Sequence, residues 1–229
     1  MVGIYMCNQN KRTMTQKKKP TPEQIQEYRT MCKRAVTNEE LKAIEAFAQE
    51  YDTFTYVYEE DGKMGVKDAA GYVLVPAQFE DIAYTYADSC RGFAVPAIRS
   101  GKMALVKPDG QGTLLSEFVY DSVQFQDGFF ILVKDGKFGL ATAGGHVVVP
   151  AEQDEVFLPM NDLVVFTKDG KNGFAMLGTD LITGAEYEAY EMTETDYLQV
   201  IKDGETGYID ADGRFTTDED ERYFNAAFD

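Results

Sequence analysis

Few side chains in this sequence are of the types that do chemistry, and those few are scattered. The only histidine, His146, lies in an apolar run with no cysteine or second histidine nearby. The three cysteines, Cys7, Cys32 and Cys90, lack the spacing of a zinc site and are odd in number, which indicates free thiols in a reducing compartment. The sequence also contains no phosphate-binding glycine loop, dinucleotide fingerprint or Gly-x-Ser-x-Gly elbow. We therefore predict that the protein is not an enzyme and has no catalytic residues, cofactor or structural metal.

One short segment resembles part of a calcium-binding loop. Asp210, Asp212 and Gly213 are followed by Glu219 at the distance of the bidentate ligand. However, Tyr208 would occupy the first ligand position, and the repeat described below already requires a turn here. A turn is therefore the preferred interpretation, with calcium binding as the alternative.

Acidic and tyrosine side chains alternate over residues 186–197. Aromatic anchors within a negative field suit a basic protein surface. The alternative is an ordinary solvated connection whose tyrosines pack inward. The predicted partner-binding residues are Glu186, Tyr187, Glu188, Tyr190, Glu191, Glu194 and Asp196.

The charge of the chain favours the same class of partner. It has 22 lysines and arginines against 39 acidic residues, a net charge of −17. Five of the basic residues and no acid lie in residues 1–20, so the body from residue 21 onward has 17 basic residues against 39 acidic ones, or −22. Such a body would be repelled by a nucleic acid, which is bound through clustered lysine and arginine. We predict a disordered basic tail over residues 1–20.

The sequence also predicts a cytoplasmic location without a membrane partner. The apolar stretch at residues 2–6 is shorter than the roughly 7–15 residues of a signal-peptide core. No window approaches the roughly 20 apolar residues of a membrane-spanning helix.

A short phrase recurs five times, at residues 61–65, 100–104, 135–139, 169–173 and 203–207, in the form Asp-Gly-Lys-x-Gly or a close variant. Its first glycines are separated by 39, 35, 34 and 34 residues. A period in this range indicates one supersecondary unit copied along the chain, each copy packing on its neighbours.

The third copy shows what one unit contains. Apolar runs at 129–133 and 138–141 flank an Asp-Gly pair at 135–136, which is typical of a tight β-hairpin. A third apolar run at 146–149 ends at Pro150, because proline cannot donate to a strand ladder. Each unit is therefore predicted to hold about three antiparallel strands.

An acidic residue recurs 17–20 positions after the first glycine of each unit. A carboxylate that binds local backbone at a turn is the preferred interpretation, and a column of carboxylates for a partner is the alternative. These residues are Glu80, Asp121, Asp154, Glu188 and Glu221.

The order of these features, over residues 54–224, resembles the WG repeat, also called the KWG repeat. Its units run Asp-Gly-Lys-Trp-Gly, an Asp-x-x-Gly turn, an apolar strand, proline and Tyr-Asp. The five copies here are degenerate, with Ala104 for one glycine, Glu205 for one lysine and no tryptophan anywhere in the chain. The resemblance implies a non-catalytic module of the kind found in many bacterial proteins. We expect methionine and phenylalanine to fill the tryptophan slot, which is occupied by Met64, Met103, Phe138, Asn172 and Thr206.

Two amphipathic helices are predicted before the repeats, over residues 21–51. The first begins at Thr21, a capping residue, and the second at a capping box formed by Thr37 and Glu40. The expected fold is an all-β antiparallel array of five units over residues 52–229, behind an N-terminal two-helix cap. Units of about 34 residues are short for propeller blades of about 40–45, which favours an open twisted array over a closed ring.

These features predict a protein-binding repeat module that engages a basic protein partner. Small size, acidity and the lack of catalytic residues would suit an immunity protein that neutralises a toxin. The alternative is a repeat protein that binds carbohydrate or cell-wall fragments, against which the lack of tryptophan counts.

Overall fold

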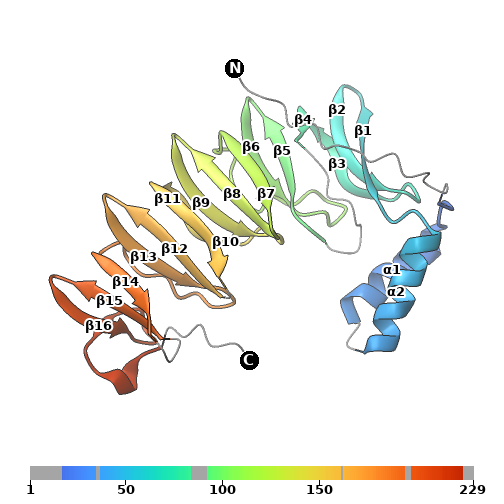
Figure 1. Cartoon of the computed structure of the whole chain (residues 1–229). Helices are drawn as coiled ribbons and strands as arrows, with labels where there is room; N and C mark the ends of the chain where they lie inside the picture. The colour runs from blue at the N-terminus through green and yellow to red at the C-terminus, as the bar shows by residue number, and fades with distance from the viewer. Residues whose placement is uncertain (1–16, 35–36, 84–91, 161, 194–196, 224–229) are drawn as a thin grey trace, which may run out of the picture.

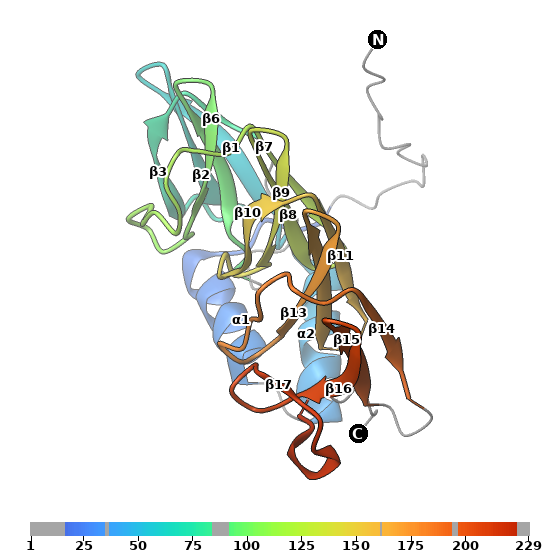
Figure 2. The ribbon, with the colours of Figure 1, turned by 90° about the vertical axis from the view of Figure 1, so that its left-hand side faces the viewer.

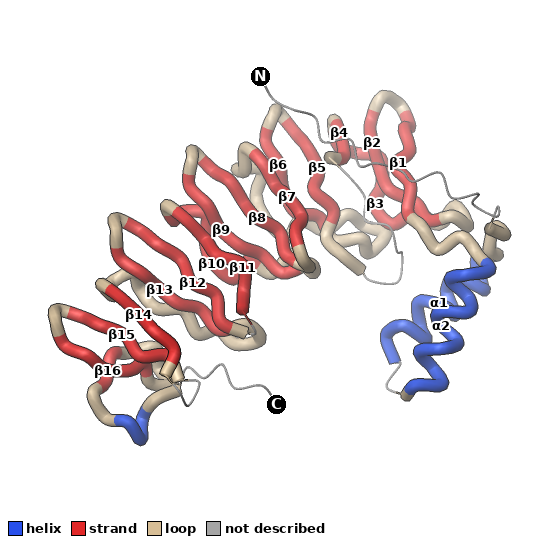
Figure 3. Tube along the Cα trace, viewed as in Figure 1, coloured by secondary structure: helices blue, strands red, loops and turns tan. Residues whose placement is uncertain are grey.

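In the computed structural model, five small antiparallel sheets follow one another along a curved, open array that begins with two helices (Figure 1). The structure describes residues 17–34, 37–83, 92–160, 162–193 and 197–223. The predicted open all-β array with a helical cap is confirmed, and no sheet closes into a barrel within these residues. Figure 2 shows the same succession of sheets after a turn of 90°, and Figure 3 shows it by secondary structure.

The sheets, numbered 1 to 5 along the chain, hold three or four strands each. Sheet 1 contains β1 (Thr55–Glu60), β2 (Lys63–Asp68) and β3 (Val73–Phe79). Sheet 2 contains β4 (Asp81–Ile82), β5 (Val95–Arg99) and β6 (Lys102–Val106). Sheet 3 contains β7 (Ser122–Gln126), β8 (Phe129–Lys134), β9 (Lys137–Thr142) and β10 (Val147–Gln153). Sheet 4 contains β11 (Glu155–Met160), β12 (Leu163–Lys168) and β13 (Lys171–Met176). Sheet 5 contains β14 (Ala189–Met192), β15 (Leu198–Lys202), β16 (Glu205–Ile209) and β17 (Phe215–Thr216), and a short 3-10 helix follows at Glu219–Glu221.

Each sheet is built around one of the five predicted hairpins. In the third, Asp135 has φ 50° and Gly136 has φ 76°, and the other four turns repeat this pair of positive values. Two successive positive φ angles define a type I′ turn, whose twist matches that of the flanking strands. The hairpin prediction is confirmed at all five positions.

The number of strands around each hairpin differs from the predicted three. An additional strand precedes the hairpin in sheets 2 to 5, namely β4, β7, β11 and β14. In sheets 2 and 4 the strand after the hairpin is reduced to isolated bridges, such as Met103 with Tyr120 and Asn172 with Tyr187. The unit is therefore a sheet of up to four strands.

The core is divided into four apolar layers, one between each pair of neighbouring sheets. The layer between sheets 4 and 5 contains Phe174 and Tyr187, both fully buried, together with Leu198 and Val200. Met64 and Met103 pack against other layers, as expected for the tryptophan slot. Phe138 is 36% exposed, so the expectation is wrong there.

The two helices pack against one end of sheet 1. They are α1 (Pro22–Arg34) and α2 (Asn38–Glu50), and the predicted capping box of α2 is present. Ile25 and Tyr28 of α1 are buried, and Arg29 forms an ion pair with Asp68 at the end of β2. Figure 1 shows the pair extending from this end of the sheet. Tyr56 on β1 stays 41% exposed, so the helices leave part of the outer sheet uncovered.

Residues 17–20 do not belong to a disordered tail. Lys18 forms a parallel bridge with Tyr51, and its Nζ lies 2.7 Å from a carboxylate oxygen of Glu50. Lys17 donates to the carbonyl of Ala48. The rest of the predicted tail, residues 1–16, lies outside the described residues.

Candidate functional site

The recurrent acidic residues stand at the elbows where the chain passes from one sheet to the next. Each elbow residue donates its backbone N–H to a carbonyl in the first strand of the next hairpin. The four pairs are Glu80 with Ile98 (3.0 Å), Asp121 with Val133 (2.8 Å), Asp154 with Thr167 (2.8 Å) and Glu188 with Ile201 (2.8 Å).

The carboxylate of each elbow residue accepts a hydrogen bond from the turn of that same hairpin. The donors are the backbone N–H groups of Ser100 to Glu80 (2.8 Å), Asp135 to Asp121 (2.7 Å), Asp169 to Asp154 (2.7 Å) and Gly204 to Glu188 (3.2 Å). One residue thus fixes the next hairpin at two points. We call this arrangement the elbow clamp.

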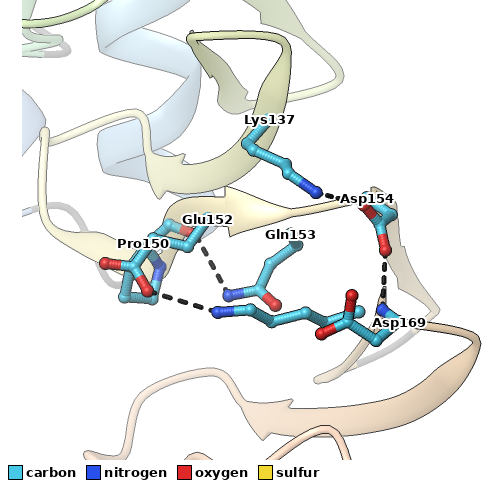
Figure 4. A network of polar contacts seen from close by, with 7 residues as sticks. Lys137, Pro150, Glu152, Gln153, Asp154 and Asp169 are labelled. Atoms are coloured by element: carbon cyan, nitrogen blue, oxygen red, sulfur yellow. Dashed lines mark hydrogen bonds and ion pairs between the residues drawn. The ribbon is translucent and has the colours of Figure 1, made fainter.

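Two elbow clamps include a lysine from the hairpin of their own unit. Lys137 pairs with Asp154, which in turn holds the N–H of Asp169, as Figure 4 shows. Lys102 pairs with Asp121 in the same way. These contacts explain why lysine follows Asp-Gly in the repeat: it neutralises the carboxylate that joins its own sheet to the next.

The clamp lowers the pKa of Asp121 and Asp154. The main cause is the lysine hydrogen bond, followed by the hydrogen bond from the turn N–H, and both favour the ionised carboxylate. The column of carboxylates is therefore engaged within the fold, which supports the turn interpretation at four of its five members. Glu221, the last member, accepts a hydrogen bond from the hydroxyl of Thr216.

Replacing Asp154 with asparagine should lower the melting temperature at neutral pH, because it removes the charge that holds Lys137 and the next turn. The folded-state pKa of Asp154 lies below the unfolded value, so the clamp stabilises the protein above about pH 4 and the contribution is lost as pH falls further. Thermal melts at neutral pH and between about pH 4 and pH 2 should therefore show the difference from wild type shrinking with acidity. Asp180→Asn, an exposed position without a clamp, is the control. A difference that persists unchanged in acid would contradict the assignment.

The calcium-like segment is an ordinary turn. The side chain of Asp210 accepts hydrogen bonds from the backbone N–H groups of Asp212 and Arg214. The carboxylate of Asp212 pairs with the guanidinium of Arg214. These contacts occupy the oxygens that a cation would need, as the turn interpretation predicts.

The other residues with possible chemistry lie apart from one another. His146 is exposed in the turn before β10, and Cys32 on α1 is partly buried. Cys7 and Cys90 lie outside the described residues. Where the structure describes the chain, three or more histidine, cysteine or acidic side chains do not gather at any point.

The predicted partner-binding residues divide into a buried set and an exposed set. Tyr187 is fully buried, and burial raises the pKa of its hydroxyl to about 12, so its assignment to a binding surface is wrong. Glu188 belongs to an elbow clamp, and Glu186 pairs with Lys202 at 2.9 Å. Tyr187 lies inside because it precedes the elbow, where the chain turns its apolar face towards the core.

Tyr190 and Glu191 form the exposed set, on the edge strand β14. All four residues of this strand are exposed, and Tyr190 is 43% accessible although its ring meets Phe174 edge-on with 5.3 Å between centroids. Met192, which the sequence prediction omitted, is 37% exposed on the same strand. Glu194 and Asp196 lie outside the described residues.

Comparisons with known proteins identify no family for this chain. No family model matches it, and no curated protein matches it. Among solved structures, Kluyveromyces lactis Hsv2 aligns at 9% identity with a TM-score of 0.29, over 72% of this chain and 59% of the Hsv2 chain. This chain thus spans less than two thirds of the length of that protein. Within the described residues, neither helix has the length and apolar character needed to cross a membrane.

Proposed function

We propose that this protein is a non-catalytic binding module that engages a basic protein partner, in the manner of a cytoplasmic immunity protein that neutralises a toxin. The proposal rests on one observation. The edge strand β14 presents Tyr190 and Glu191 to solvent, within a stretch of the chain, residues 172–201, that contains six acidic residues and no lysine or arginine.

The field around this strand suits a cationic protein. Glu155 begins the neighbouring edge strand β11 and is exposed, as Glu191 is on β14. A protein with a net charge of −17 attracts a basic partner over distances comparable to the Debye length, about 8 Å at physiological salt. Such attraction raises the association rate more than it slows dissociation.

The proposal is tested by capturing partners from the source cell with the wild-type protein and measuring the affinity of each identified partner. We expect a basic protein whose binding weakens between about 50 mM and about 500 mM salt, mainly through a slower association rate. The double variant Glu155→Lys/Glu191→Lys should weaken binding about tenfold or more at low salt. Glu188 is left unchanged because its carboxylate holds the Gly204 turn.

The matched control reverses two exposed charges far from β14. Glu59→Lys/Glu60→Lys on β1 makes the same change in net charge at the other end of the array. It should reduce the association rate less than the β14 variant does. A captured partner that is neutral or acidic, or one whose affinity ignores both salt and the β14 variant, would contradict the proposed function.

A further inference from the structure

We infer that the partner inserts an extended basic segment, with bulky apolar side chains at alternate positions, between the edge strands β11 and β14. This inference rests on the proposed function and specifies its contact surface. The surface consists of Phe157 and Met160 on β11 and Tyr190 and Met192 on β14. We call it the apolar mouth.

The two β11 residues face sheet 5. Phe157 pairs across the strand with Val165, and Met160 pairs with Leu163. Directly paired residues of antiparallel strands point to the same face of a sheet. Both partners belong to the apolar layer between sheets 4 and 5, so Phe157 and Met160 are directed to that layer.

The two β14 residues face sheet 4 for the same reason. Tyr190 pairs with Val200 and Met192 pairs with Leu198, and both partners lie in the same layer. The four residues of the mouth therefore converge from two neighbouring edge strands on the open side of one core layer.

The exposure of these four side chains shows that the layer is uncovered at this edge. Phe157 is 48% exposed, Met160 73%, Tyr190 43% and Met192 37%. Exposed clusters of large apolar side chains mark interaction surfaces in water-exposed proteins. Methionine adapts its shape to different ligands, which suits a surface that receives another chain.

The neighbouring gap between sheets 3 and 4 is closed differently. There β7 places Gln124 and Gln126 opposite Ile131 and Phe129, which pack against the layer that faces sheet 4. Glutamine thus stands on the edge strand of sheet 3 where sheet 5 has Tyr190 and Met192. Polar edge residues are the usual protection of an open sheet, so their replacement in sheet 5 distinguishes the apolar mouth from this gap.

Charge and strand geometry identify the occupant. Glu155 and Glu191 stand on the two edge strands beside the mouth, where lysine or arginine of a partner would pair with them. Side chains alternate in an extended segment, so one face can fill the mouth while the other meets these carboxylates. A second copy of this chain would bring another net charge of −17 to the same place and be repelled.

Two synthetic peptides test the inference without the natural partner. One, of about nine residues, alternates lysine with leucine or phenylalanine, and the other alternates lysine with serine at the same length and charge. By fluorescence anisotropy we expect the apolar peptide to bind about tenfold more tightly or better. Met160→Gln and Met192→Gln should each reduce that preference. Leu114→Gln, which alters a 47% exposed residue outside the mouth, should leave it unchanged.

The outcomes separate this inference from the proposed function. Equal binding of the two peptides, or no binding of either, would overturn the apolar mouth, whereas the proposed function is decided by the salt dependence of the captured partner. Insensitivity of the apolar peptide to both methionine variants would also overturn it. So would a concentration-dependent dimer in sedimentation experiments that Met160→Gln abolishes, because the mouth would then be a contact between two copies.

Discussion

Replacing Arg29 with methionine is expected to lower the free energy of unfolding of sheet 1 and the helices by about 3–5 kcal/mol. The Nη2 atom of Arg29 lies 2.7 Å from Oδ2 of Asp68, whose side chain is 0% exposed. Without the guanidinium, Asp68 would keep the hydrogen bond from the N–H of Tyr72 but would hold a buried charge with no cation. Denaturant titration followed by circular dichroism at the helical band measures the change.

A double variant separates the loss of charge pairing from the loss of packing. Asp68→Asn retains an oxygen that can accept from Tyr72, so Arg29→Met/Asp68→Asn should be more stable than Arg29→Met alone. A loss of less than about 1 kcal/mol in Arg29→Met would show that the helices are held on sheet 1 by apolar contacts of Ile25 and Tyr28 instead.

The hairpins and the second helix start could be predicted because their signals are local. An Asp-Gly pair such as 135–136 sets two positive φ angles by itself, and the box of Thr37 and Glu40 caps its own helix. The resemblance to the WG repeat stays a prediction, since no family model tests it. What recurs locally in the sequence recurs in the structure.

The additional strands could not be predicted because nothing local marks where they begin. β7, β11 and β14 each start directly after an elbow residue, with no turn signal between the two sheets. Their pairing depends on a hairpin that lies further along the chain, and β4 and β14 have only two and four residues. The elbow clamp itself depends on contacts over 14 to 20 residues, such as that of Asp121 with Asp135, which no spacing rule indicates.

The candidate site was predicted in part for the same reason. Alternation of acid and tyrosine identified the segment around Tyr190 and Glu191 correctly as exposed, but it could not show which tyrosine faces the core. Tyr187 comes before the elbow and Tyr190 after it, so the two belong to different sheets. Phe157 and Met160 lie about 30 residues away in the sequence, and only the stacking of sheets 4 and 5 relates them to Tyr190.

Replacing Gly139 with alanine is expected to cost about 3 kcal/mol, near the upper end for an added core methyl group. This second glycine of the repeat serves a purpose different from that of Gly136. A Cβ at Gly139 would lie 2.6 Å from both the carbonyl oxygen of Val149 and the backbone nitrogen of Ala151, so strand β10 would have to move. Thermal and denaturant unfolding of Gly139→Ala measure the loss.

Gly136→Ala is the matched comparison, because it adds the same methyl group to open space at φ 76°. Its cost should be only about 1–2 kcal/mol, from the left-handed backbone. Ala104, fully buried at the position of Gly139 in sheet 2, agrees with this difference. There the strand after the hairpin is reduced to bridges at Met103 and Val106, which leaves room for a methyl group. Equal stability of Gly139→Ala and Gly136→Ala would mean that β10 is not held against β9 as closely as the structure shows, and the repeat would need its second glycine for another reason.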